Sequence, residues 1–145
     1  MKLISAAIIA FLVLEFLNIL ILYFAPGSKL GNGMGFFKGF EKAKKDPDNF
    51  AMLSYLVNWV AGTKLIFIAL LIVILITGDD TTKIFSLVAL ILSIATFYWK
   101  LFPIIRSLDK RGQIDPKGYS RTLAIMITSF LAVFITVLVI FLLNP

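Results

Sequence analysis

The chain alternates four long apolar runs with polar connections. The runs cover Leu3–Phe24, most of 47–78, Ile84–Ile105 and Arg121–Leu143. Each is long enough, as a helix, to cross the roughly 30 Å hydrocarbon core of a bilayer. The pattern therefore predicts an all-α integral membrane protein whose four transmembrane helices form an antiparallel bundle. We expect one membrane domain over residues 1–145, with helices at about 3–24, 47–78, 84–105 and 120–143.

Turn and capping residues mark where these helices begin and end. Asp46 can accept hydrogen bonds from the first free N–H groups of the second helix. Asp80 or a following threonine is expected to cap the third helix, and Ser120 or Asp115 the fourth. Pro103 is expected to kink or end the third helix, because it lacks an N–H and its ring crowds the preceding turn.

The first connection, residues 25–46, joins a glycine-rich half to an aromatic and basic half. The glycine run Gly31–Gly35 lacks the GK[ST] ending of a phosphate loop and follows a transmembrane helix rather than a strand. The second half contains Phe36, Phe37, Lys38, Phe40, Lys42, Lys44 and Lys45. One interpretation is a short interfacial helix, with its aromatic rings among acyl chains and its lysines at anionic headgroups. The other is a solvated loop whose lysines only set the topology.

The distribution of basic residues predicts the orientation in the membrane. Ten basic residues lie on the side of the two long connections, nine within them and Arg121 at the start of the fourth helix, against Lys2 and Lys83 on the opposite side. Positive charge in short loops favours the cytoplasm. We therefore expect a multi-pass protein of the cell membrane with connections 25–46 and 106–119 in the cytoplasm and both termini outside.

Composition narrows the classes of function. The chain is 60% hydrophobic and 15% charged, which is typical of a membrane protein. It has no cysteine and no histidine, so the commonest general base and transition-metal ligand are missing. We expect no cofactor, no metal and no catalytic residue; the exception considered is lipid modification at the cytoplasmic face. The net charge of +6 indicates anionic lipids as partners rather than nucleic acid.

Two residues of opposite charge interrupt the apolar runs, Glu15 in the first helix and Lys64 in the second. Both come out about 18–20 Å below the outer ends of helices that run in opposite directions, so they can pair. Charged groups at such depth are costly and face a partner or a wet cavity. Asn18, one turn from Glu15, is expected to join them, and Asn58 and Lys100 are candidates for additional polar lining.

A single glutamate in the first of four short helices, within Val13-Leu14-Glu15-Phe16, resembles the small multidrug-resistance transporters. The chain departs from that family in its longer first connection, in Lys64 and in its decisive charge bias. No activity or ligand is therefore taken from the family.

Two hypotheses follow for function. In the first, the protein binds or transports a small solute or ion through a polar site at Glu15 and Lys64, as a homo-oligomer. In the second, it is a non-transporting scaffold, chaperone or regulatory subunit whose basic cytoplasmic loops contact anionic lipid or a partner. In a purely structural interpretation of the pair, it only fixes which helices meet.

Overall fold

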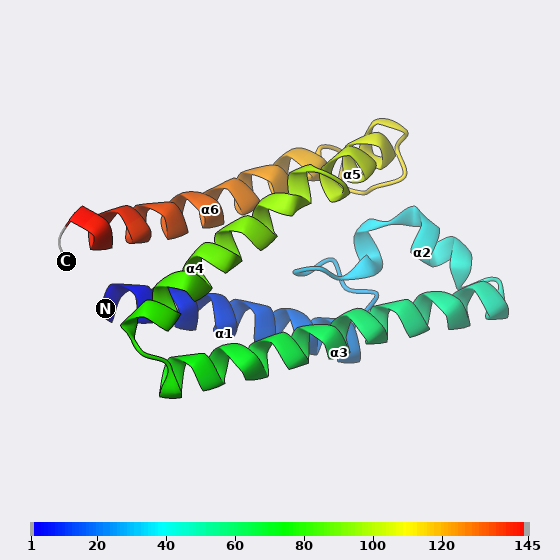
Figure 1. Cartoon of the computed structure of the whole chain (residues 1–145). Coiled ribbons are helices and arrows are strands. Elements are labelled where there is room, and N and C mark those ends of the chain that lie inside the picture. Colours follow the sequence, from blue (N-terminus) through cyan, green and yellow to red (C-terminus); the bar gives the residue numbers. More distant parts are fainter. Residues whose placement is uncertain (1, 144–145) are drawn as a thin grey trace.

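The computed structural model describes residues 2–143, which are largely helical and contain no β-strand (Figure 1). The long helical stretches are α1 (Lys2–Phe24), α3 (Pro47–Thr77), α4 (Asp80–Ala95) continued by α5 (Leu101–Lys110), and α6 (Tyr119–Leu143). The short ones are η1 (Met34–Phe36), α2 (Lys38–Ala43) and η2 (Thr96–Tyr98). Four stretches are long and apolar enough to cross a membrane when α4 to α5 is taken as one.

The two long connections lie at one end of the molecule and both termini at the other (Figure 1). α1 and α3 lie side by side along most of their length, and α4 crosses from them to α6. The turn between α3 and α4 is at the same end as the termini. The basic residues of both connections are thereby gathered at a single end.

α1 packs against each of α3, α4 and α6, and most extensively against α3. Its fully buried residues Ile4, Ile8 and Ile19 belong to a stripe with steps of three and four residues, the spacing of one helix face. Glu15 falls on that stripe. Glu15 is thus on the helix that contributes more buried residues to the core than any other described helix.

α3 presents a matching stripe to α1. Val57, Ala61, Ile68 and Leu71 are buried, and Lys64 occupies the remaining position of the same three-and-four pattern. Ala61 is completely buried, and its small side chain lets the two helices approach closely. The two charged residues therefore lie in the packed seam and not on the outer faces.

Of the three helix caps predicted from the sequence, the structure confirms the first. The side chain of Asp46 accepts from the N–H groups of Asp48 and Asn49 at 3.1 and 3.2 Å, which confirms it as the cap of α3. The expected cap at Asp80 is wrong. Asp79 accepts from the Thr82 N–H at 2.7 Å, since Asp80 is already the first helical residue.

The helix of the third apolar run breaks before Pro103, and it ends later than the predicted Ile105. α4 ends at Ala95, η2 follows, and α5 then runs through Pro103 to Lys110. Pro103 lies in the first turn of α5, where its missing N–H costs little, and the break falls on the turn that its ring would crowd. The helix therefore restarts before the proline and does not end at Ile105.

Candidate functional site

Glu15 and Lys64 form the ion pair that their depth predicts. Lys64 Nζ donates to Glu15 Oε2 at 2.6 Å, and the two side chains are 24% and 21% exposed. Each charge offsets the desolvation cost of the other, which is large for an isolated ion removed from water. The contact joins residues 49 positions apart and holds α1 and α3 in a single register.

A cavity of about 700 Å³ opens beside this pair. Its walls come from α1, α3, α4 and α6 and carry the aromatic rings of Phe11, Trp59, Phe67 and Phe130. Glu15 and Lys64 are the charged residues among its described lining. The site thus combines an apolar chamber with one charged pair in its wall, the usual make-up of a small-molecule site.

The first connection folds back against α1 and covers one end of the cavity. The Asn32 N–H donates to Asn18 Oδ1 at 3.1 Å, and Asn32 itself lines the cavity. Gly31 has φ of +51°, and a Cβ there would lie 2.1 Å from Asn18 Oδ1. Figure 1 shows this loop pointing back between α3 and α4. Asn18 therefore holds the loop, a role that its spacing from Glu15 did not indicate.

The loop contains several glycines because its backbone segments lie too close together to leave room for side chains. A Cβ on Gly35 would lie 2.2 Å from the Gly27 carbonyl oxygen and 2.8 Å from that of Ser28. The Gly35 N–H donates to the Ser28 oxygen at 3.1 Å, so the two backbone segments are in direct contact. No residue larger than glycine fits at position 35 between these two segments.

The two long connections bind each other. Asp115 N–H donates to the Phe36 oxygen at 2.9 Å, and Lys38 N–H to the Gln113 oxygen at 3.0 Å. Lys29 also forms an ion pair with Asp115, and its ammonium holds the pKa of that carboxyl below its ordinary value. The covering loop is therefore fastened to the second connection as well as to α1.

The predicted short helix in the first connection is present as α2, but its aromatic residues do not face outward as expected. Phe40 is 4% exposed and packs on Phe50, with ring centroids 6.0 Å apart. The Phe36 ring stacks on Tyr119 at 4.0 Å, and Phe37 is half-buried. Phe36 thus joins the first connection to the start of α6, and Phe40 joins α2 to α3. The four lysines are exposed: Lys38, Lys42, Lys44 and Lys45.

Two expected lining residues lie elsewhere. Asn58 is exposed, and its amide donates to the Ser54 oxygen of its own helix at 2.9 Å. The Lys100 ammonium lies 5.3 Å from the centroid of the Trp99 ring. Neither lines the cavity. Both predictions are wrong because helix position alone does not say which face turns inward.

Asp109, which sequence reasoning missed, joins α5 to α6. Its carboxylate accepts from Gly118 N–H and Ser120 N–H, both at 2.9 Å, and from Ser120 Oγ at 2.6 Å. It is 6% exposed. The expected caps, Ser120 and Asp115, are therefore wrong. Arg106 and Lys110 lie four residues apart, the spacing of one helix face. This spacing was the sequence signal that the helix continues past Ile105 and includes Asp109.

Asp109→Ala is expected to lower the melting temperature of the purified protein clearly. The substitution removes three acceptor contacts and leaves the first N–H groups of α6 without their partner. Asp48→Ala, at an exposed site in the first turn of α3, is the control and should have a small effect. Equal melting curves for both variants would contradict this role of Asp109.

Comparison of the chain with protein-family models, curated proteins and solved structures found no match.

Proposed function

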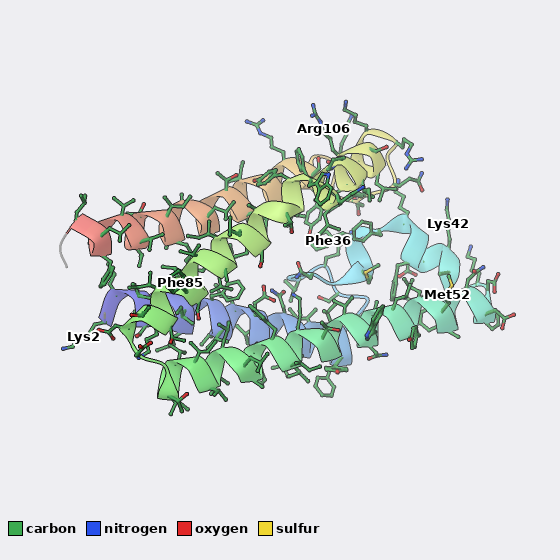
Figure 2. All side chains as sticks on the ribbon, viewed as in Figure 1. Lys2, Phe36, Lys42, Met52, Phe85 and Arg106 are labelled. Carbon is green, nitrogen blue, oxygen red and sulfur yellow. The ribbon has the colours of Figure 1, made fainter. Side chains whose placement is uncertain are left out.

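We propose that the four long helices form an antiparallel bundle in the cell membrane, with both termini outside and connections 25–46 and 106–119 in the cytoplasm. The position of both basic connections at one end supports this orientation. Figure 2 shows nitrogen-tipped side chains at that end, where Lys42 and Arg106 point away from the ribbon.

The function we propose is the binding of a small amphipathic solute beside the Glu15–Lys64 pair, as a step in its movement across the membrane. The observation that carries the proposal is the cavity of about 700 Å³ with this pair in its wall. That volume is in the range of sites for small molecules. Because the cavity lies within one chain, the proposed binding does not require a second copy.

The partial exposure of the pair supports binding over a purely structural role. Each side chain keeps about a fifth to a quarter of its surface accessible, and both line the cavity. A pair that only fixed helix register would be enclosed by apolar neighbours. Here Asn18 and Asn32 add amide groups to the same wall. A ligand in the chamber therefore meets polar groups at one end and aromatic rings around it.

Ser93→Phe is expected to abolish binding, because Ser93 lines the cavity and a benzyl group would fill part of it. Ser86→Phe, two turns away on α4 and outside the cavity, is the control. Trp59 also lines the cavity. Its fluorescence reports on the contents of the cavity once Trp99, the second tryptophan, is replaced by Phe. A long-chain alcohol brominated at its chain end should quench Trp59 saturably in the control and not in Ser93→Phe. Saturable quenching in both would contradict the proposal.

A second candidate, a non-transporting scaffold on anionic lipid, is favoured by the exposed lysines of the first connection. It predicts that changing Lys42, Lys44 and Lys45 together to Glu sharply reduces the anionic lipid retained by the purified protein. The control changes Lys2 and Lys83, at the other end, to Glu. Equal lipid retention in both proteins, measured by mass spectrometry, would remove this candidate.

A further inference from the structure

We propose that the ligand is a single-chain amphiphile with an anionic head group, which reaches the cavity sideways from the cytoplasmic leaflet and places its head on Lys64. This inference rests on the proposed function and names the class of solute. It is carried by the shape of the opening and by the charges around it.

The cavity is open toward the surface that would face lipid. Trp59, Val60 and Met126 line it and are 63%, 48% and 49% exposed. Trp59 and Val60 belong to α3, and α3 and α4 diverge from the turn that joins them toward the end with the two connections (Figure 1). An apolar chain can therefore enter between α3 and α4, beside Trp59 and Val60.

The end of the cavity toward the two connections is covered. Asn32 lines the cavity there, and its backbone is bonded to Asn18. The loop that contains it is also fastened through the Lys29–Asp115 ion pair. A water-dissolved solute at that end meets this loop first, whereas an amphiphile in the adjacent leaflet meets the side opening. The geometry thus favours a ligand that partitions into lipid.

Hydrogen-bond donors at the site favour an anionic head. An ammonium has three donors, and Lys64 uses one toward Glu15. Asn18 accepts from Asn32 through its carbonyl oxygen, which leaves its NH₂ donors on the side-chain end that lines the cavity. A carboxylate or phosphate head can accept from these groups, while the chain occupies the aromatic part of the chamber.

The charged residues around the cavity also favour an anionic ligand. The two connections and the adjoining first turns of α3 and α6 carry ten basic and five acidic residues, and the ten basic side chains are exposed. Their positive potential concentrates anionic amphiphiles in the leaflet beside the side opening. The opposite end carries Lys2, Lys83, Asp79 and Asp80, which balance. A cationic amphiphile would be repelled from the cytoplasmic end.

The test compares three probes of equal chain length, each brominated at the chain end, that differ only in a carboxylate, ammonium or hydroxyl head. In Trp99→Phe protein reconstituted in nanodiscs, we expect the carboxylate probe to quench Trp59 at a concentration at least about tenfold lower than the other two. Lys64→Met should remove this preference, and Glu15→Gln should strengthen it, because the competing carboxylate is gone. Acetate and inorganic phosphate, which lack a chain, should not displace the probe.

Each other result overturns the inference. Equal affinity for the three heads, or preference for ammonium, would show that the head is not recognised as an anion. Displacement by acetate or phosphate would show a site for soluble anions. In these cases saturable binding of the hydroxyl probe would leave the proposed function standing. If none of the three probes binds saturably, the proposed function fails together with the inference.

Discussion

Lys64→Met is expected to destabilise the protein by about 3–5 kcal/mol, because it leaves the Glu15 carboxylate buried without its partner. The pair lies in the packed seam of α1 and α3, between Ala61 and Ile68 on one helix and near Ile19 on the other. Glu15→Gln should cost less, since an amide can still accept a hydrogen bond from the ammonium.

The double variant Glu15→Gln, Lys64→Met should recover most of the lost stability, since replacing a buried pair by less polar groups is often close to neutral. Denaturant unfolding of the four proteins in one detergent gives the coupling energy of the pair. Lys100→Met is the control, because Lys100 is exposed on Trp99 and should tolerate the change. A single Lys64→Met variant as stable as Lys100→Met would contradict a structural contribution of the pair.

The same double variant separates the two roles of the pair. If it regains stability but no longer prefers the anionic probe, the pair serves recognition as well as helix register. If it regains both stability and the anionic preference of the original protein, the charged pair only fixes which helices meet, and the proposed recognition by Lys64 is abandoned.

The sequence predicted the pair because its position depends on local regularities alone. Helical rise sets the depth of each residue, and Lys64 follows Val57 and Ala61 in steps of four and three, the spacing of a single helix face. The same arithmetic failed for Asn58 and Lys100. Depth says how far a residue lies along a helix, whereas lining depends on rotation, which the neighbouring helices decide.

The covering loop was beyond prediction because its contacts join distant residues. Asn32 meets Asn18 fourteen positions earlier, and Lys29 meets Asp115 eighty-six positions later. No periodicity encodes such contacts. Glycines 31 and 35 were visible in the sequence, but a flexible loop and a tightly folded one call for the same residue type. Only the nearby Asn18 and Gly27 oxygens show which of the two applies.

Gly35→Ala is expected to displace the covering loop and expose the cavity to water from the connection end. The new Cβ would meet backbone oxygens of Gly27 and Ser28, which cannot rotate away as a side chain does. Overpacking of this kind costs about 1–3 kcal/mol, enough to raise the open population from about fivefold to about a hundredfold or more. Because the chain has no cysteine, Ser93→Cys supplies a single label site in the cavity wall. A membrane-impermeant maleimide added from the connection side should modify it at least about fivefold faster in the Gly35→Ala background.

Gly39→Ala is the matched control for this experiment, because a Cβ on Gly39, within α2, meets no atom within 4 Å. Its label rate should equal that of the Ser93→Cys protein alone, which separates loop displacement from a general effect of added methyl groups. Labelling from the opposite side should stay slow in every background, since the altered loop lies only at the connection end. Equal rates for the two glycine variants would mean that the loop does not close the cavity, and solutes would then reach Lys64 from water without passing through lipid.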